Sequence, residues 1–255
     1  MFELLQNGLY TRFSYSSELA LHLGTVALMF GAALLCYLLG SLNTSIIASR
    51  LVFGDDVRRH GSGNAGLTNM LRTYGAKGAV LTLAGDILKT ALSVLVGGLL
   101  LGLQYQGPFS VGFGGYLGVF FCMLGHTFPV YYRFKGGKGV LCAAVGLGIL
   151  TPIVMGVSLL VFVIVVAFTR YISLGSIVSA AMYPLFLNVL FKVFYTSTPP
   201  AHVLLISFAA AAMIIWMHRS NIVRLWRGEE NKFSFHHKKE NPAEDTGTAD
   251  GKDDK

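Results

Sequence analysis

The stretch GVLCAAVGLGILTPIVMGVSLLVFVIVVAFT, residues 139–169, decides the fold of this chain. It contains 31 residues and no charged side chain. A helix crosses the hydrocarbon core of a bilayer in about 20 residues, so the stretch is long for one crossing and short for two. Thr151-Pro152 lies near its middle, and the residue before a proline is disfavoured in a helix. The sequence therefore predicts two helices that form a short hairpin with its turn at Pro152.

The composition of the whole chain indicates a membrane protein. The chain has 255 residues, of which 53% are hydrophobic and 13% charged, and its mean hydropathy is +0.59. Soluble domains carry about 25% charged residues. Between residues 19 and 228 the only acidic residues are Asp55, Asp56 and Asp86. This excludes a soluble enzyme, a disordered chain and a disulfide scaffold, and it predicts an all-α polytopic integral membrane protein.

Basic residues set the number and direction of the membrane spans. Arg50–Lys77, Arg133–Lys138, Arg170 and the segment from Arg219 onward hold 17 of the 20 Lys and Arg residues. Cytoplasmic loops carry the excess of Lys and Arg, and these groups share one face only if 139–169 crosses twice. We therefore predict seven transmembrane helices, with the N-terminus outside and the C-terminus cytoplasmic. The other apolar runs are 19–49, 78–103, 111–130, 171–192 and 200–217.

The chain divides into three parts by composition. Residues 1–18 are mixed and polar and are expected to be extracytoplasmic, and residues 19–228 form the seven-helix membrane domain. Residues 229–255 are polar and of low complexity, which predicts a disordered charged cytoplasmic tail. The tail has five Lys and eight Asp or Glu, so the net charge of +7 leaves +10 for residues 1–228. That excess is split among short loops, which suits anionic lipid or phosphate-bearing ligands better than nucleic acid.

The first candidate site is a glycine-rich loop, GSGNAGLTN at 61–69, preceded by DDVRRH at 55–60. Glycines let backbone N–H groups converge on an anion, and Ser, Thr and Asn side chains add donors. The loop also fits GxGxxG, but a dinucleotide fingerprint must follow a strand, and here an apolar helix precedes it. A plain turn is the alternative, although a turn has no need of so many hydrogen-bonding side chains.

Two further clusters carry lysines. In GDILK at 85–89, Asp86 and Lys89 share a helix face. They form either an ion pair that locks helix packing or a site in which Asp86 orients Lys89 toward a polar cavity. GHTFP at 125–129 is followed by FKGGKG at 134–139, where two lysines flank paired glycines. A basic loop that touches anionic lipid is the alternative for this segment.

A fourth cluster combines RYISLGS at 170–176 with HRSN at 218–221. Because all four clusters are expected at the cytoplasmic face, we predict one pocket for more than one phosphate. The sequence shows no Ser-His-Asp set, HExxH motif, carboxylate pair or HxxxxD motif. Cys36, Cys122 and Cys142 lie in apolar runs without metal-ligand spacing, so we expect packing roles and no metal site.

Taken in order, these blocks resemble the bacterial membrane-embedded acyl-phosphate:glycerol-3-phosphate acyltransferase family. The resemblance runs from Gly40 to Lys232, and Asn43 departs from it where the family usually has proline. The matching blocks are GS at 40–41, DVRRHGSGNAGLTN at 56–69, GDILK at 85–89, GHTFPVYYRFKGGKGV at 125–140, RYISLGSI at 170–177 and HRSNIVRLWRGEENK at 218–232.

The resemblance implies transfer of a fatty acyl group from acyl phosphate to the 1-hydroxyl of glycerol 3-phosphate, a step of phospholipid biosynthesis. Lysophosphatidic acid and inorganic phosphate would be the products, without metal or cofactor. It also implies a bacterial cytoplasmic (inner) membrane location, with the active site facing the cytoplasm. Expected partners are both substrates, membrane lipid and, transiently, the enzyme that makes acyl phosphate.

On this basis we expect four catalytic residues, which are Ser41, Arg58, Lys138 and His218. The residues expected to bind substrate are Ser62, Gly63, Asn64, Gly66, Asn69, Lys89, His126, Lys135, Gly136, Gly137, Ser173, Ser176, Arg219 and Asn221. The acyl phosphate is assigned to the first loop and glycerol 3-phosphate to the later basic segments.

The source of the base stays open between a histidine, His126 or His218, and an oxygen of a substrate phosphate. We favour the phosphate because no histidine has an obvious carboxylate to orient it. A membrane transporter or channel for a phosphate-bearing anion is the alternative class of function. Transport predicts basic residues at both entrances, whereas Arg12 and Lys192 alone are assigned to the outer side.

Overall fold

In the computed structural model, residues 17–102 and 112–233 are described, and within these ranges the chain is helical without strands. Two 3₁₀ turns, η2 (Val57–Arg59) and η3 (Val130–Tyr132), lie in the connections. The α-helices are α2 (Glu18–Ser41), α3 (Thr44–Phe53), α4 (Leu67–Leu101), α5 (Phe113–Thr127), α6 (Val140–Leu150), α7 (Pro152–Thr169), α8 (Ile172–Tyr195), α9 (Ala201–Met217) and α10 (Arg219–Trp226). The predicted all-α class is confirmed.

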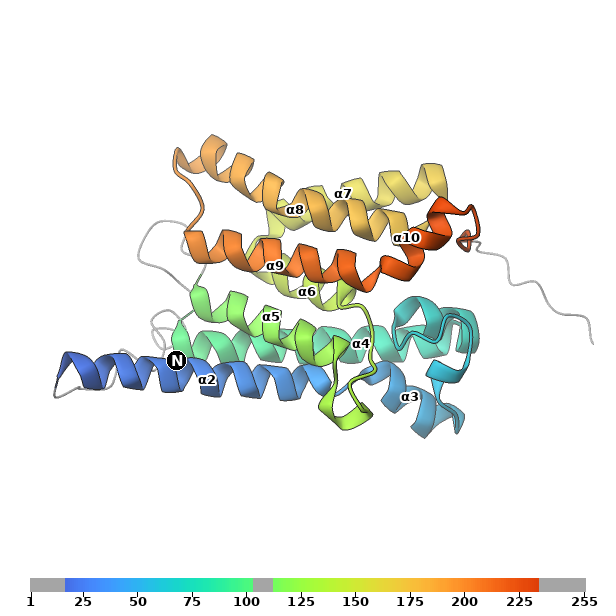
Figure 1. The fold of residues 1–255 in the computed structure, drawn as a ribbon, viewed down its shortest axis with the longest axis horizontal. Coiled ribbons are helices and arrows are strands. Elements are labelled where there is room, and N and C mark those ends of the chain that lie inside the picture. The colour runs from blue at the N-terminus through green and yellow to red at the C-terminus, as the bar shows by residue number, and fades with distance from the viewer. Residues whose placement is uncertain (1–16, 103–111, 234–255) are drawn as a thin grey trace, which may run out of the picture.

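The long helices run side by side as a bundle (Figure 1). Helices α2, α4 and α5 pack together on one side, α7 and α8 on the other, and α6 and α9 link the two groups. Glycines let the first group approach closely: a Cβ at Gly40 would overlap the backbone of Cys122 on α5. One end of the bundle carries α3, the start of α4 and α10, and the turn between α8 and α9 lies at the other end (Figure 1).

Five segments among the described residues are long and apolar enough to cross a membrane, and α9 with α10, bent by 55°, makes a sixth. The predicted break at Thr151-Pro152 is confirmed, because α6 ends at Leu150 and α7 begins at Pro152. The hairpin is uneven, however. Helix α7 has 18 residues, whereas α6 has 11 residues, a length of about 16 Å or half the hydrocarbon thickness.

The expected first span, 19–49, falls within one apolar segment that consists of two helices. Helix α2 ends at Ser41, and Asn43 begins α3 by accepting a hydrogen bond from the Ile46 amide at 3.2 Å. The Asn43 amide also donates to the carbonyls of Ala65 and His126, each at 3.3 Å. A hydropathy window does not detect a cap inside an apolar run, because a single asparagine hardly changes its mean. Asn43 thus uses its side chain where the resembling family usually has proline.

Helix α4 begins eleven residues before the predicted span, at Leu67 rather than residue 78. It bends at Gly75, where φ is 67°, a left-handed value that favours glycine. The part of α4 before the bend, from Leu67 to the residue before Gly75, lies at the polar end of the bundle.

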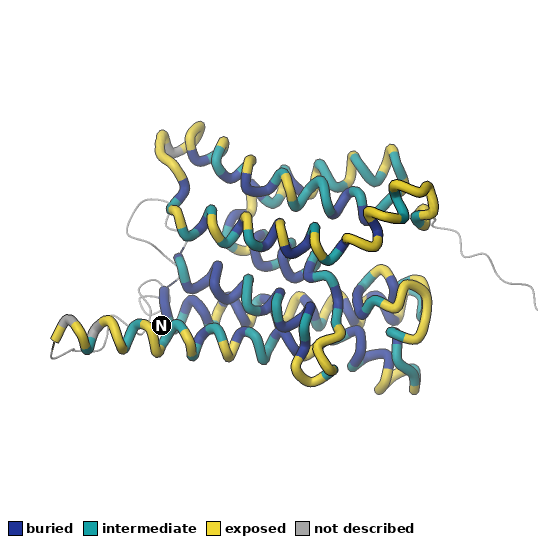
Figure 2. Tube along the Cα trace, viewed as in Figure 1, coloured by how far each residue is buried: buried dark blue, intermediate teal, exposed yellow. Residues whose placement is uncertain are grey.

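Many positions on the outer faces of the long helices are exposed, and the buried positions gather where the helices face one another (Figure 2). Large apolar side chains on the outside of the bundle are exposed, including Phe30, Phe168 and Leu205. Charged Asp86 and Lys89 are buried in its interior. An apolar exterior, with the few buried charged groups facing the interior, is the arrangement of a protein whose solvent is lipid.

Candidate active site

A pocket of about 460 Å³ opens between the two groups of helices at the polar end of the bundle. Its polar wall comes from the glycine loop before α4, the loop before α6, the start of α8 and the junction of α9 and α10. Its apolar wall comes from α6, α7 and α9. The apolar lining includes Leu141, Leu147, Met155, Leu159, Phe162 and Ile214.

The glycine-rich loop is built around buried Asn69. Its side-chain oxygen accepts from the Ser62 amide at 3.0 Å, and its amide donates to the carbonyls of Val57 and His60 at 3.1 and 3.0 Å. Gly61 and Gly63 have φ of 55° and 69°, which lets the chain fold around this side chain. Ser62, Asn64 and Gly66 line the pocket, and Gly66 caps α4 without a side-chain hydrogen bond. The helix N-terminus is therefore available to an anion.

Arg58 connects the two glycine loops instead of entering the pocket. It bonds Asp56 through Nε at 2.9 Å and through its terminal nitrogen at 2.7 Å. The other terminal nitrogen donates to the carbonyls of Tyr132 and Lys135 at 3.1 and 3.2 Å. The hydrogen bonds from Arg58 hold the pKa of Asp56 well below its usual range, so the pair stays ionised at neutral pH.

Replacing Arg58 tests this connecting role. We expect Arg58→Ala and Arg58→Lys each to lower activity about tenfold, because neither keeps the planar fork that reaches a carboxylate and two carbonyls. Arg59→Ala is the matched control, since Arg59 is its exposed neighbour and should stay near wild type. The measurement is turnover of purified variants. Wild-type activity in Arg58→Lys would show that charge alone suffices.

At the other end of the polar wall, Glu230 joins the start of α8 to α10. It accepts hydrogen bonds from Ser173 at 2.8 Å, Asn221 at 2.7 Å and Arg224 at 2.7 Å. Lys138 in turn donates to the side-chain oxygen of Asn221. Burial raises the pKa of Glu230, but the three hydrogen bonds together lower it by more. The net effect is a pKa below the usual value.

Sequence analysis assigned no role to Glu230 and began the disordered tail at residue 229. Residues 229–233 are instead placed against the bundle, where the Phe233 amide also donates to the Arg170 carbonyl at 2.7 Å. That part of the tail prediction is wrong, because a single buried carboxylate anchors a segment whose composition reads as polar tail. Residues 234–255 and 1–16 lie outside the described residues.

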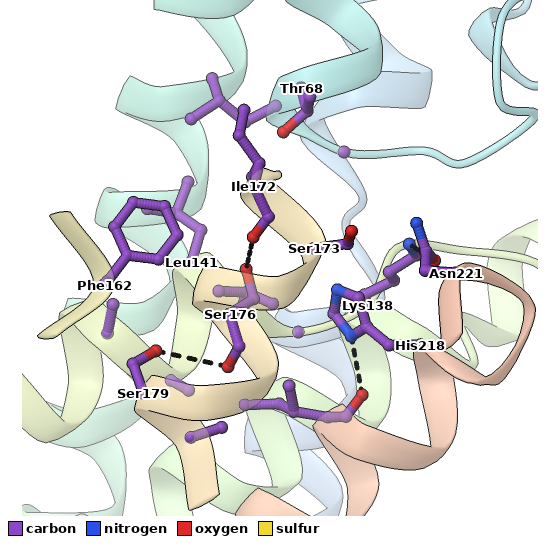
Figure 3. Close-up of a pocket in the computed structure, with 18 of the residues that line it drawn as sticks. Thr68, Lys138, Leu141, Phe162, Ile172, Ser173, Ser176, Ser179, His218 and Asn221 are labelled. Carbon is purple, nitrogen blue, oxygen red and sulfur yellow. Dashed lines mark hydrogen bonds between the residues drawn. The ribbon is translucent and has the colours of Figure 1, made fainter. Parts of the chain in front are cut away.

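Lys138 and His218 face each other across this wall, with Ser173 and Asn221 beside them (Figure 3). Burial lowers the pKa of Lys138 to about 8. The Nδ1 atom of His218 lies 2.8 Å from the Ile214 carbonyl oxygen. A carbonyl only accepts, so Nδ1 carries the proton and Nε2 is left with a lone pair. Ser176 also lines the pocket, and its hydroxyl donates to the Ile172 carbonyl (Figure 3).

Beneath the pocket lies a buried group of Asp86, Lys89 and His126. Lys89 Nζ is 2.7 Å from Asp86 and 2.9 Å from His126 Nδ1, while Asp86 is 3.6 Å from that nitrogen. The premise that no carboxylate lies near a histidine is therefore wrong, because distant sequence segments meet here. Asp86, His126 and Cys142 also have the spacing of metal ligands, but the Lys89 ammonium already lies between Asp86 and His126.

The pocket brings together many of the predicted site residues and leaves others out. Those that line it are Ser62, Asn64, Gly66, Asn69, His126, Lys138, Ser173, Ser176, His218 and Asn221. Those outside its lining are Ser41, Arg58, Gly63, Lys89, Lys135, Gly136, Gly137 and Arg219. The lining also includes Asp86, which was predicted only as a partner of Lys89, and residues not predicted for the site, among them Arg72, Tyr183, Arg224 and Glu230.

The residues left out contact other parts of the protein. Ser41 donates to the Tyr37 carbonyl at 2.8 Å, and Arg219 donates to the Trp216 carbonyl and lies over its ring. Lys135 is exposed. Gly136 and Gly137 donate their amides to the carbonyls of Thr127 and His126, at 3.2 and 3.0 Å. Their contacts suit a supporting role, in which they hold the loops that form the pocket.

The described helices form a bundle with an apolar exterior, and its pocket has a cationic wall and an apolar wall. These features define an integral membrane protein whose pocket suits a ligand with a charged part and an apolar part. Comparison with known proteins narrows this class. The family description for glycerol-3-phosphate acyltransferases matches residues 30–228. The chain belongs to the glycerol-3-phosphate acyltransferase family, and it is an acyltransferase of phospholipid biosynthesis.

Individual relatives agree along most of their length. A glycerol-3-phosphate acyltransferase from Clostridioides difficile is 36% identical over 203 residues, covering 78% of this chain and 93% of the relative. One from Paraburkholderia phytofirmans is 38% identical over 227 residues, covering 86% and 97%. The crystal structure of PlsY (YgiH), an integral membrane glycerol 3-phosphate acyltransferase in its glycerol 3-phosphate form, is 33% identical. It superposes with a TM-score of 0.69 over 81% of this chain and 96% of that structure.

Proposed function

We propose that this enzyme moves a fatty acyl group from acyl phosphate to the 1-hydroxyl of glycerol 3-phosphate, forming lysophosphatidic acid and inorganic phosphate. The observation that carries the proposal is a pocket in which a cationic wall suited to phosphate faces an apolar wall. Related PlsY structures are described in a glycerol 3-phosphate form and a lysophosphatidic acid form. Glycerol 3-phosphate carries the phosphate that the polar wall would recognise, and lysophosphatidic acid adds the acyl chain that the apolar wall would recognise.

The polar wall supplies two phosphate positions. Lys138, Ser173, His218 and Asn221 would hold the phosphate of glycerol 3-phosphate, since they surround one part of the pocket (Figure 3). The start of α4, with Asn64 and Thr68 in the pocket lining, would hold the acyl phosphate. The amides of Ser62, Gly63, Ala65 and Gly66 shape this loop by donating within the protein. The acyl chain would extend along the apolar wall of α6 and α7.

The chemistry needs mainly orientation and charge stabilisation. The 1-hydroxyl oxygen attacks the acyl carbonyl carbon, the bond between that carbon and the phosphate oxygen breaks, and the hydroxyl proton leaves with His218 Nε2 or a phosphate oxygen as acceptor. Acyl phosphate is already activated, so positioning of the two substrates and stabilisation of the developing oxyanion supply the rate enhancement.

The polar end of the bundle is proposed to face the cytoplasm of a bacterial inner membrane. In this proposal α2 and α4 to α9 make seven passes, of which α6 is a short one, and the N-terminus lies outside and the C-terminus inside. The basic loops around Arg58, Lys138 and Arg219 share the end where the pocket opens, which supports this orientation by the positive-inside rule. That face is also where the enzyme that makes acyl phosphate would make transient contact.

The direct test mixes the purified protein in detergent with palmitoyl phosphate and glycerol 3-phosphate and follows phosphate and lipid products. Phosphate release that requires glycerol 3-phosphate, with lysophosphatidic acid formed, is the expected result. Release without the acceptor would mean hydrolysis. Product formed only from another acyl donor would overturn the donor assignment, and a folded protein that makes no product with any donor would return anion transport as the leading hypothesis.

The rate should depend on pH through Lys138. Its pKa is lowered to about 8 by burial, so the ammonium that binds phosphate is lost as the pH rises through that value. The phosphate of the acceptor is a dianion above a pH of about 6 and gains nothing further. We therefore expect kcat/KM for glycerol 3-phosphate to fall above a pH of about 8, and to stay level in Lys138→Arg, whose guanidinium remains charged. Equal declines in both proteins would assign the effect elsewhere.

A further inference from the structure

We infer that His126 serves the reaction as a fixed hydrogen-bond donor, with its proton on Nε2, and that Lys89 holds it in this state as a positioning residue. The role of His126 in the reaction rests on the proposed acyl transfer. The position of its proton rests only on the contacts of Asp86, Lys89 and His126. This assignment replaces the sequence-based view of His126 as a candidate base. It also gives Lys89 a role beyond an ion pair with Asp86 that locks helix packing.

The hydrogen bonds of Lys89 determine which ring nitrogen of His126 carries the proton. The ammonium has three N–H donors and no acceptor. In this structure it has three partners: Asp86 Oδ1 at 2.7 Å, His126 Nδ1 at 2.9 Å and the Leu42 carbonyl at 3.3 Å. Asp86 Oδ1 receives a further bond from the Thr44 hydroxyl at 2.6 Å. Every donor of the ammonium is thus used, and the carboxylate balances its charge.

It follows that Nδ1 of His126 must be the acceptor. A protonated Nδ1 would point its hydrogen at an ammonium that has no lone pair, and it would add a second positive charge 2.9 Å from the first. The neutral ring therefore carries its single proton on Nε2. A histidine in this state has no free lone pair with which to take a proton from a substrate.

The Nε2–H group lies where the two glycine loops meet. His126 is on the last turn of α5, its side chain is 5% exposed, and it lines the pocket. A Cβ at Gly137 would overlap Nε2 and would lie 2.7 Å from the Ala65 carbonyl oxygen. Gly137 has no side chain, so the ring edge is left uncovered beside the loop of residues 62–66. A carbonyl or phosphate oxygen of the substrate held between these loops would accept this hydrogen bond.

The two histidines that line the pocket consequently carry their protons on opposite ring nitrogens. The Ile214 carbonyl fixes the proton of His218 on Nδ1, which leaves an acceptor at Nε2. Lys89 fixes the proton of His126 on Nε2, which leaves a donor there. One site thus has a group that accepts the hydroxyl proton and another that stabilises the oxygen on which negative charge develops. A lock for helix packing alone would need the Asp86–Lys89 pair but would not need the ring to line the pocket.

The first experiment reads the protonation state without any activity. The protein is labelled with ¹⁵N-histidine in detergent, and the His126 signals are assigned by their loss in His126→Gln. We expect a protonated Nε2 and an unprotonated, hydrogen-bonded Nδ1 across neutral pH. A protonated Nδ1, or a charged ring, would overturn the inference. The wild-type spectrum decides this even if the proposed reaction fails in the product assay.

The second experiment separates the two ring nitrogens. Gln places an amide N–H near the position of Nε2, whereas Asn places its polar atoms near Nδ1. If donation to substrate matters, His126→Gln keeps activity within about tenfold and His126→Asn loses about 10²-fold or more, the usual cost of one oxyanion donor. Equal losses in both, or a wild-type rate in His126→Asn, would contradict a role in the reaction.

Lys89→Met tests the positioning residue. This change removes the three donors, so the His126 ring becomes free to titrate and to change tautomer. We expect a new pH dependence of the rate from titration of this ring, whose charged form would be favoured by Asp86 at 3.6 Å from Nδ1, together with a matching shift of the ¹⁵N signals. A purely structural role would lower the amount of folded protein and leave both readouts unchanged in what remains.

Discussion

Lys138→Ala should lower kcat/KM for glycerol 3-phosphate about 10²- to 10³-fold while the protein still inserts and purifies normally, because a preorganised donor to a charged oxygen is worth this much. Lys138 is a cation of the polar wall, next to Ser173 and His218 (Figure 3). Its side chain is half-buried, so its bond to a phosphate is charge-assisted and little screened by water. Removing it also leaves the Asn221 side-chain oxygen without this donor.

Lys135→Ala provides the matched control. The two lysines stand three residues apart in one loop and have the same charge, but Lys135 is exposed and outside the pocket lining. We expect Lys135→Ala to stay within about twofold of wild type, as is usual for a surface charge. The comparison is made in initial rates at limiting glycerol 3-phosphate. Equal losses in the two variants would indicate that the loop acts through its total charge, and the assignment of Lys138 to a phosphate would fail.

Lys138→Arg refines the same prediction. Arginine keeps the positive charge but has a planar fork in place of a compact ammonium. Because Lys138 also bonds Asn221 within a crowded wall, the larger group should recover only part of the activity at neutral pH. Complete loss in this variant, with normal insertion, would show that the position demands shape as much as charge.

The membrane fold was predictable because it follows from composition and periodicity. Apolar length, the position of Pro152 and the distribution of Lys and Arg were enough to find each long helix and the break before α7. The break at Asn43 and the early start of α4 were missed. Both depend on hydrogen bonds to distant segments, such as the bonds from Asn43 to the carbonyls of Ala65 and His126.

The candidate site was predictable as a set of loops but not as a set of side chains. A charged residue in a polar loop looks the same in sequence whether it binds a ligand or supports the loop. Arg58 and Lys138 illustrate this: Arg58 bonds Asp56 and two carbonyls, whereas Lys138 enters the pocket. Glu230 was missed because it lies in a segment whose composition is that of a polar tail. The partners that hold it in place, Ser173 and Arg224, come from separate helices.

Gly137→Ala is the substitution with the largest expected effect, a loss of activity of about 10³-fold or more, since it disturbs both loops and a pocket donor together. The added Cβ would overlap His126 Nε2 and would lie 2.7 Å from the Ala65 carbonyl oxygen. The ring cannot simply rotate away, because Nδ1 is bonded to Lys89. The carbonyl cannot move freely either, since it accepts from Asn43. The clash is therefore expected to separate the 62–66 and 136–138 segments.

Gly156→Ala is the control, because the same atom added there, on α7, meets nothing within 4 Å. Alanine favours a helix over glycine by roughly 1 kcal/mol, so this variant should keep wild-type activity and unfold no earlier than wild type. Turnover and thermal unfolding in one detergent compare the two variants directly. Normal activity in Gly137→Ala would falsify the close approach of the two loops. Lost activity with an unchanged unfolding temperature is the result we expect, because the clash lies at the pocket rather than in the apolar packing between the helices.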